Sequence, residues 1–180
     1  MSTLKLNLPT VLTLSRIVLI PVFVLSVDQH PVLGAVVFGI ASITDFLDGY
    51  LARKSGQITK FGIIMDPIAD KFLIISALVV LVDMERIEVW IAITLIVREF
   101  LVTGLRVVAL SKDIVIPAEM GGKLKTGAQI TAILCLILVG SFIDNLPIDL
   151  YDIGLVFIWI ALVLAVLSGV QYTLSFWRKI

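Results

Sequence analysis

The sequence predicts an all-α integral membrane protein, built as a bundle of six transmembrane helices. Of its 180 residues, 59% are hydrophobic, which exceeds the roughly 45–50% of ordinary soluble domains. The excess is gathered in long apolar runs that short polar connections separate, as in proteins that cross a membrane several times. These runs are longer than the about 9–11 residues of a barrel strand, and helices satisfy their own backbone hydrogen bonds in lipid.

Six apolar runs account for the expected helices. In chain order they cover residues 10–27, 31–53, 61–82, 87–110, 123–143 and 149–176. The first run contains Arg16 and lacks a clear small-residue cleavage site, so we expect a retained anchor and not a cleaved signal peptide. In residues 1–9, leucines alternate with polar residues, which indicates a short interfacial segment before the first helix.

The breaks between the runs contain charged residues, glycine or proline, which end helices. They fall at residues 28–31, 54–56, 83–86, 111–122 and 144–147. In the fourth break, Gly121 and Gly122 are expected to form a turn. The single cysteine, Cys135, lies in an apolar run and is expected to be a packing residue. No repeat or linker divides the chain, so residues 1–180 are expected to form a single domain.

Lysine and arginine residues predict how the helices are oriented. The basic residues of the termini and the even-numbered connections are Lys5, Arg53, Lys54, Lys60, Lys112, Lys123, Lys125, Arg178 and Lys179. The odd-numbered connections hold only Arg86. Because positive connections stay in the cytoplasm, both termini and the even connections are expected to face the cytoplasmic side of the cell membrane. The net charge is zero, and no nucleic-acid partner is expected.

Four aspartates lie at the facing ends of the second and third spans, where each charge costs roughly 2.5–3.5 kcal/mol on insertion. Asp45 and Asp48 are three residues apart, and Asp66 and Asp70 are four apart, so each pair shares one helix face. The short connection makes the two helices antiparallel neighbours, and the carboxylates then converge. Their repulsion requires either protonation or bound cations, and oxygen ligands favour Mg²⁺, Mn²⁺ or Ca²⁺.

Small and basic residues accompany the aspartates. Gly49 and Gly62 remove side chains beside them, which lets a ligand or the facing helix approach closely. Arg53, one turn beyond Gly49, offers a positive fork for phosphate oxygens. The simpler alternative is a set of helix-end charges paired with Arg53, Lys54, Lys60 and Lys71. This alternative explains a single carboxylate well. It does not explain four carboxylates that lie in pairs on one face of each of two neighbouring helices.

These residues resemble the signature of the CDP-alcohol phosphatidyltransferase family. The pattern reads Asp45-x2-Asp48-Gly49-x2-Ala52-Arg53-x8-Gly62-x3-Asp66-x3-Asp70, and every fixed position is present. The six spans and the length extend the resemblance over nearly the whole chain. It implies that the first three aspartates hold divalent metal, Mg²⁺ or Mn²⁺, with two ions expected. It also implies that Asp70 helps to hold metal and acts as the general base.

The resemblance further implies the substrate, CDP-diacylglycerol, whose lipid-side phosphorus an alcohol attacks while CMP leaves. Gly49, Arg53 and Thr59 match positions that bind the CDP moiety, and Gly62 lies beside them in the pattern. Asn7 and Thr10 are expected either to line the nucleotide site, as the family's N-terminal segment does, or to cap the first helix. A homodimer is also implied.

The acceptor alcohol is expected to be sn-glycerol 3-phosphate. Three stretches look like family members that use it: Asn7-x-Pro9-Thr10 through Arg16 to Pro21; Phe61-Gly62 to Asp66-Pro67-x-Ala69-Asp70-Lys71; and Arg98-Glu99, Gly104-Leu105-Arg106 and Gly122-Lys123-x-Lys125-Thr126. Arg106, Lys123 and Lys125 surround the second cytoplasmic connection and could cradle a phosphate dianion. Arg98 lies about two turns from Arg106, and Glu99 is expected to pair with a nearby cation. Membrane anchoring by the cations, or a structural pair of Arg98 and Glu99, is the alternative.

Three other functions remain open. The nearest is the same chemistry with another acceptor, such as phosphatidylglycerol or an inositol phosphate. A membrane prenyltransferase also binds magnesium diphosphate with aspartates, but the single motif and the six spans argue against it. A divalent cation transporter would need carboxylates near mid-membrane and a path through both faces.

Overall fold

We describe the protein from a computed structural model. It describes residues 8–55, 60–112, 120–141 and 149–179. Within these, only the backbone is described for residues 8–14, 16, 45–55, 60–70, 110, 120, 121, 123 and 179. The described residues form helices and short turns without strands, which confirms the all-α class.

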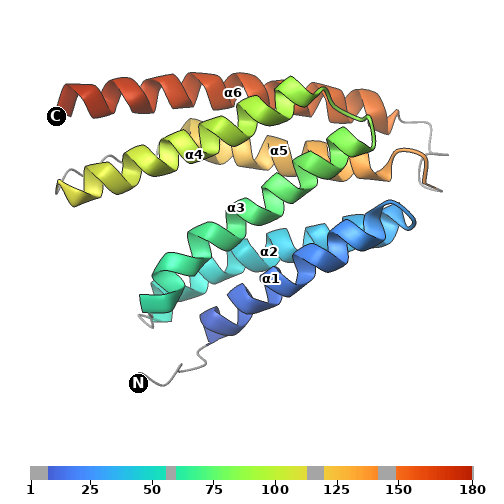
Figure 1. Cartoon of the computed structure of the whole chain (residues 1–180), viewed down its shortest axis with the longest axis horizontal. Coiled ribbons are helices and arrows are strands. Elements are labelled where there is room, and N and C mark those ends of the chain that lie inside the picture. The colour runs from blue at the N-terminus through green and yellow to red at the C-terminus, as the bar shows by residue number, and fades with distance from the viewer. Residues whose placement is uncertain (1–7, 56–59, 113–119, 142–148, 180) are drawn as a thin grey trace. The chain divides into compact units, whose positions relative to one another are not determined.

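Six helices follow one another along the chain (Figure 1). Their bounds are α1 Leu8–Val27, α2 Pro31–Ser55, α3 Lys60–Asp83, α4 Val89–Ser111, α5 Met120–Leu138 and α6 Leu150–Lys179. The number and order of the predicted helices are therefore confirmed. Most predicted ends agree to within three residues.

The fifth helix differs from the prediction at both ends. It begins at Met120, so Gly121 and Gly122 belong to its first turn and not to a preceding turn, as was wrongly predicted. Glycine is tolerated there because the first N–H groups of a helix have no partner within it. The helix ends at Leu138 and not at residue 143, because Gly140 adopts a positive φ of 80°. Ser141 then donates from its Oγ to the carbonyl oxygen of Leu138 at 2.6 Å.

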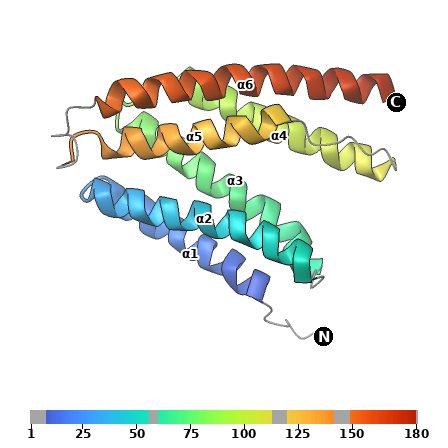
Figure 2. The ribbon, with the colours of Figure 1, turned by 180° about the vertical axis from the view of Figure 1, so that it is seen from behind.

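The chain packs as two compact units, Met1–Val80 and Leu81–Ile180, and the division falls within α3. In the N-terminal unit, α1 and α2 lie side by side (Figures 1 and 2). The rings of Phe23 and Phe38 are fully buried, with centroids 5.7 Å apart. At Gly34 an added Cβ would lie 2.7 Å from the Cβ of Val27, so glycine is needed where the two helices approach.

In the C-terminal unit, α6 packs against both α4 and α5. Trp90 contacts Trp159 and Arg98 contacts Ser168, so residue numbers rise together and α4 runs parallel to α6. Helix α5 runs antiparallel to α6, as Figure 2 shows along their length. Gly154 makes this contact close, since an added Cβ would lie 2.6 Å from Leu136.

Apolar side chains cover much of the outer surface of the described helices. Exposed examples include Leu25 at 80%, Val18 at 65% and Val107 at 62%. Within the described residues, one helix, Leu150–Arg178, is long and apolar enough to cross a membrane; Ile17–Val27, Pro31–Thr44 and Leu124–Leu138 are shorter apolar stretches. Exposed apolar surface on this scale is unfavourable in water.

Candidate active site

The four aspartates of the signature lie on helical backbone. Asp45 and Asp48 belong to α2, whereas Asp66 and Asp70 belong to α3. Helical backbone preserves the spacings that assign each pair to one helix face. Their side chains lie outside the described residues, so the convergence of the four carboxylates stays a prediction.

The residues predicted to bind the CDP-lipid are described as backbone or not at all. Asn7 and Thr59 lie in segments that the structure does not describe. For others only the backbone is described; these are Thr10 in α1, Gly49 and Arg53 in α2 and Gly62 in α3. Lys123, predicted to bind the acceptor phosphate, is likewise described only as backbone in α5.

The donor chemistry of the aspartates determines which cation they fit. Among the side chains that the structure describes, no group of three or more Asp, Glu, His or Cys residues could hold a metal ion. The four aspartates of the signature are not among these described side chains. Their carboxylates form an all-oxygen donor set, which fits a hard divalent ion such as Mg²⁺ or Mn²⁺.

A cluster of charged side chains joins α4 to α5. Nη1 of Arg98 donates to Oε1 of Glu99 at 3.1 Å, and Nζ of Lys125 donates to the same oxygen. Only 13% of the Arg98 side chain, 16% of Glu99 and 3% of Lys125 are exposed. The predicted pairing of Glu99 with a nearby cation is therefore confirmed, and it involves two cations.

The cluster places two cations beside one carboxylate. Arg98 and Lys125 are positive and Glu99 is negative, so these three groups together carry one positive charge. Burial weakens solvent screening and strengthens every electrostatic interaction at the cluster. It also makes each cation costly to leave unpaired.

Arg98 is bound to α6 as well as to Glu99. Its Nε donates to the carbonyl oxygen of Ala165 at 3.2 Å, and its Nη2 donates to Oγ of Ser168 at 2.7 Å. All three guanidinium nitrogens therefore have partners in the protein. The side chain fastens α4 to α6, and its predicted binding of the acceptor phosphate stays a prediction.

Arg106 lies eight residues after Arg98 on α4, about 12 Å along the helix axis. It is exposed, and its Cζ lies 5.9 Å from the ring centroid of Tyr172 on α6. A cation over an aromatic face is attracted by the ring. This arrangement is compatible with phosphate binding by Arg106.

Sequence reasoning missed three buried polar residues near this cluster. Ser168 and Tyr172 are each 4% exposed on α6, and Gln129 is fully buried on α5. The available signal was their spacing, because Tyr172 follows Ser168, and Gln129 follows Lys125, by four residues within apolar runs. Within the described residues, the Tyr172 hydroxyl and both polar atoms of the Gln129 amide have no hydrogen-bond partner.

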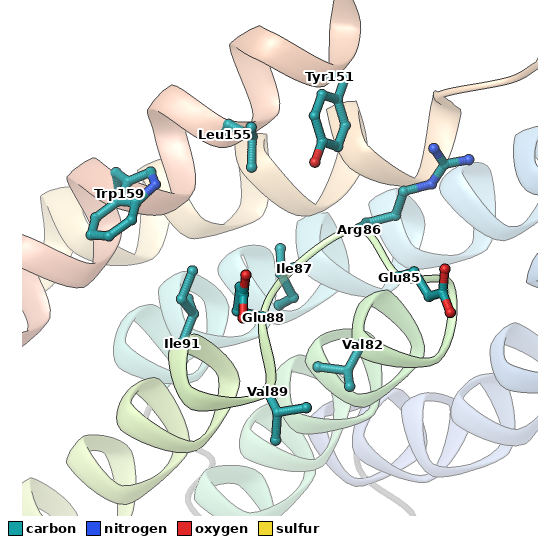
Figure 3. Close-up of a pocket in the computed structure, with 10 residues that line it drawn as sticks. All are labelled: Val82, Glu85, Arg86, Ile87, Glu88, Val89, Ile91, Tyr151, Leu155 and Trp159. Carbon is teal, nitrogen blue, oxygen red and sulfur yellow. The ribbon is translucent and has the colours of Figure 1, made fainter.

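A separate cavity of about 520 Å³ lies beside the turn before α4 and the start of α6. Figure 3 shows Glu88, Tyr151 and Trp159 around it, while Arg86 extends toward α5 and donates to the carbonyl oxygen of Val139 at 3.2 Å. None of the predicted site residues lines this cavity. It lies near the start of α4, about 26 Å along that helix from Arg106.

Comparison with protein families gives one match over most of the chain. The family model described as CDP-alcohol phosphatidyltransferase matches residues 6–167. The matched range includes all four aspartates and every basic residue of the candidate acceptor site.

Individual proteins are similar over nearly their whole length. A protein of Bacillus subtilis named CDP-diacylglycerol--glycerol-3-phosphate 3-phosphatidyltransferase is 39% identical, with 97% of each chain covered. A protein of Rickettsia felis with the same name is 38% identical over 92% of this chain and 93% of its own. A Mycobacterium tuberculosis protein named probable phosphatidylglycerophosphate synthase is 40% identical, over 97% of this chain and 83% of its own.

Proposed function

Because the chain belongs to the CDP-alcohol phosphatidyltransferase family, we propose that it transfers the phosphatidyl group of CDP-diacylglycerol to sn-glycerol 3-phosphate. The products are phosphatidylglycerophosphate and CMP. The observation that carries this proposal is the similarity over 97% of the chain to a relative named for that donor and that acceptor. The two buried basic side chains beside Glu99, Arg98 and Lys125, support a phosphorylated acceptor, because guanidinium and ammonium groups bind phosphate oxygens.

The reaction is a displacement at phosphorus. The acceptor hydroxyl oxygen forms a bond to the lipid-side phosphorus, and the bond from that phosphorus to the bridging oxygen breaks. CMP leaves with the electron pair of the broken bond. Asp70 takes the proton of the attacking hydroxyl, because an alcohol is a weak nucleophile and needs a base within hydrogen-bond reach.

The donor site would lie on α2 and α3. Asp45, Asp48, Asp66 and Asp70 would hold two divalent ions, Mg²⁺ or Mn²⁺. Such ions neutralise the diphosphate and stabilise the charge that develops on the leaving group. The CDP moiety would be bound by Gly49, Arg53, Thr59, Gly62, Asn7 and Thr10. Glycine and arginine suit this role, since one permits close approach and the other binds phosphate oxygens with a fixed fork.

The acceptor site would lie on α4 and α5. Lys125, Lys123 and Arg106 would bind the phosphate of glycerol 3-phosphate, with Arg98 as the fourth basic residue. A dianion bound by several cations becomes oriented as well as held. Its free hydroxyl can then be directed at the phosphorus of the donor, which converts a collision of two substrates into a reaction within one complex.

The proposed setting is the cell membrane. All six helices would span it as one domain of residues 1–180, with both termini and the active site on the cytoplasmic side. The apolar outer surface of the helices and the basic residues of the even connections support this arrangement. The protein would act as a homodimer. A site at the membrane surface suits a donor with two acyl chains and a water-soluble nucleotide.

Release of CMP by the purified protein in detergent tests the proposed function. CDP-diacylglycerol and Mg²⁺ would be supplied with and without sn-glycerol 3-phosphate. We expect release that depends on both the metal ion and the acceptor, and that EDTA abolishes. Release only with phosphatidylglycerol or an inositol phosphate would retain the family and refute the acceptor. Metal transport by reconstituted protein without CMP release would refute the enzyme.

A further inference from the structure

Helix α6 supports Arg98 at two consecutive residues. Oγ of Ser168 accepts from Nη2 of Arg98 at 2.7 Å and donates to the carbonyl oxygen of Leu164 at 2.6 Å. The hydroxyl of Ser168 has one proton, and it donates this proton to the backbone of its own helix. A lone pair of Oγ therefore remains to accept from Arg98. At Gly169, an added Cβ would lie 3.2 Å from Cγ of Arg98. At that distance the Arg98 side chain would have to shift by a few tenths of an ångström.

The contacts continue from Arg98 to the lysine of the acceptor site. Arg98 and Lys125 donate to the same oxygen of Glu99. A carboxylate held by two cations is restrained from both sides, so the loss of one partner alters the position of the other. The path from Ser168 to Lys125 thus runs through two charged side chains that are at least 84% buried.

The geometry points to Ser168 and Gly169 as positioning residues of the acceptor site. They fix Arg98, Arg98 fixes Glu99, and Glu99 fixes the ammonium group of Lys125. This inference rests on the proposed function, since it takes Lys125 as a ligand of the acceptor phosphate. A residue that only packed helices together would change stability, whereas a positioning residue changes the apparent affinity for one substrate.

Steady-state kinetics of four single variants test the inference. Ser168→Ala removes the acceptor of the Nη2 hydrogen bond, and Gly169→Ala places a methyl group against Arg98. For both we expect the KM for sn-glycerol 3-phosphate to rise about tenfold, which corresponds to about 1.4 kcal/mol. The KM for CDP-diacylglycerol and kcat should each stay within about twofold of wild type.

The two remaining variants are matched controls. Ser168→Thr keeps a hydroxyl at the same position and should keep the KM for sn-glycerol 3-phosphate within about twofold of wild type. Gly127→Ala makes the same chemical change as Gly169→Ala on neighbouring α5, where an added Cβ meets nothing within 4 Å. Each variant is first checked by gel filtration and by its unfolding temperature, and Ser168→Ala decides the test if Gly169→Ala does not fold.

Wild-type kinetics separate failure of the inference from failure of the proposed function. If wild type requires sn-glycerol 3-phosphate but Ser168→Ala leaves its KM unchanged, the positioning role is wrong and the proposed function stands. An equal loss of kcat in Ser168→Ala and Ser168→Thr would also refute positioning. If wild type releases no CMP with sn-glycerol 3-phosphate, the proposed function fails, and the inference fails with it.

Discussion

Glu99 determines what the two buried cations beside it can do. Its Oε1 accepts from Arg98 and from Lys125. An ammonium group has three donors and no fixed fork, so a lysine can bind a carboxylate and a phosphate oxygen together. Each nitrogen of the Arg98 guanidinium donates within the protein. At the scale of single residues, Lys125 is the residue proposed to contact the acceptor, and Arg98 is held by its own partners.

Replacement of Asp70 tests the proposed general base. In Asp70→Asn the side chain keeps its size but no longer accepts the hydroxyl proton at neutral pH. We expect turnover to fall by at least about 100-fold, the lower range for general-base catalysis, while CDP-diacylglycerol binding is mostly retained. CMP release and binding of the donor in nanodiscs measure the two effects. Near-normal turnover would show that another group takes the proton.

The buried amide of Gln129 offers a test of stability. A buried polar group without a partner costs about 1–3 kcal/mol, so Gln129→Leu is expected to stabilise the protein by about that amount. Unfolding temperature in detergent measures the change. Gln171→Leu, at an exposed position of α6, is the matched control and should have little effect. Destabilisation by Gln129→Leu would mean that the amide has a partner outside the described residues.

Sequence patterns predicted residue types better than residue partners. The depth of Arg98 and Glu99 in an apolar run indicated that they were not ordinary anchors, and the pairing of Glu99 with a cation followed. The participation of Ser168 could not be predicted, because helical periodicity assigns a residue to a face and not to a neighbour on another helix. The parallel packing of α4 and α6 supplies that neighbour.

At the scale of elements, two turns each contain a residue with left-handed backbone. Substitutions at the two positions are expected to change the unfolding temperature in opposite directions. Glu85 has a φ of 57° before α4, and Gly140 has a φ of 80° after α5. A side chain in this region costs roughly 1–2 kcal/mol. Glu85→Gly is therefore expected to raise the unfolding temperature, and Gly140→Ala to lower it. Changes of the same sign in both variants would contradict this account.

Helix ends were predicted accurately where charged residues or prolines follow an apolar run. They were predicted less accurately where glycine is the only signal. The ends beside Asp28 and Asp83 lie within one residue of the prediction. The end of α5 was placed too late because the apolar residues continue past Gly140, and hydropathy does not report φ. Gly121 and Gly122 were misread for the opposite reason, since glycine can also begin a helix when the following residues are good helix formers.

At the scale of the whole molecule, the distribution of basic residues predicts a definite orientation. With Cys135 replaced by alanine, a single cysteine at His30 should react with a membrane-impermeant maleimide on intact cells. A cysteine at Ser55 should react only after the cells are permeabilised. His30 lies in the first connection, which is predicted to face away from the cytoplasm. Ser55 lies in the second, which is predicted to be cytoplasmic. The reverse pattern of labelling would overturn the proposed topology.

Family membership could be predicted from the eight fixed positions of the signature, which resemble those of the family. The cost of carboxylates within predicted membrane spans supported a role for them in binding cations. The division into two units could not be predicted. It falls inside α3, where the sequence from Leu73 to Val82 is uniformly apolar apart from Ser76 and gives no composition change. Hydropathy therefore does not predict a boundary between two packing units that lies within one continuous helix.

Helix α6 contains 30 residues, which corresponds to about 45 Å, against about 30 Å for the hydrocarbon core of a bilayer. The surplus length is accommodated by polar helix ends that extend into the headgroup layers, or by tilt of the helix. Because Ala165 and Ser168 hold Arg98 from this helix, a change in its tilt moves their oxygens relative to α4. Short-chain and long-chain lipids in nanodiscs should therefore give different KM values for glycerol 3-phosphate, and Ser168→Ala should reduce the difference. Membrane thickness would then regulate how well the protein holds a substrate that never enters the lipid.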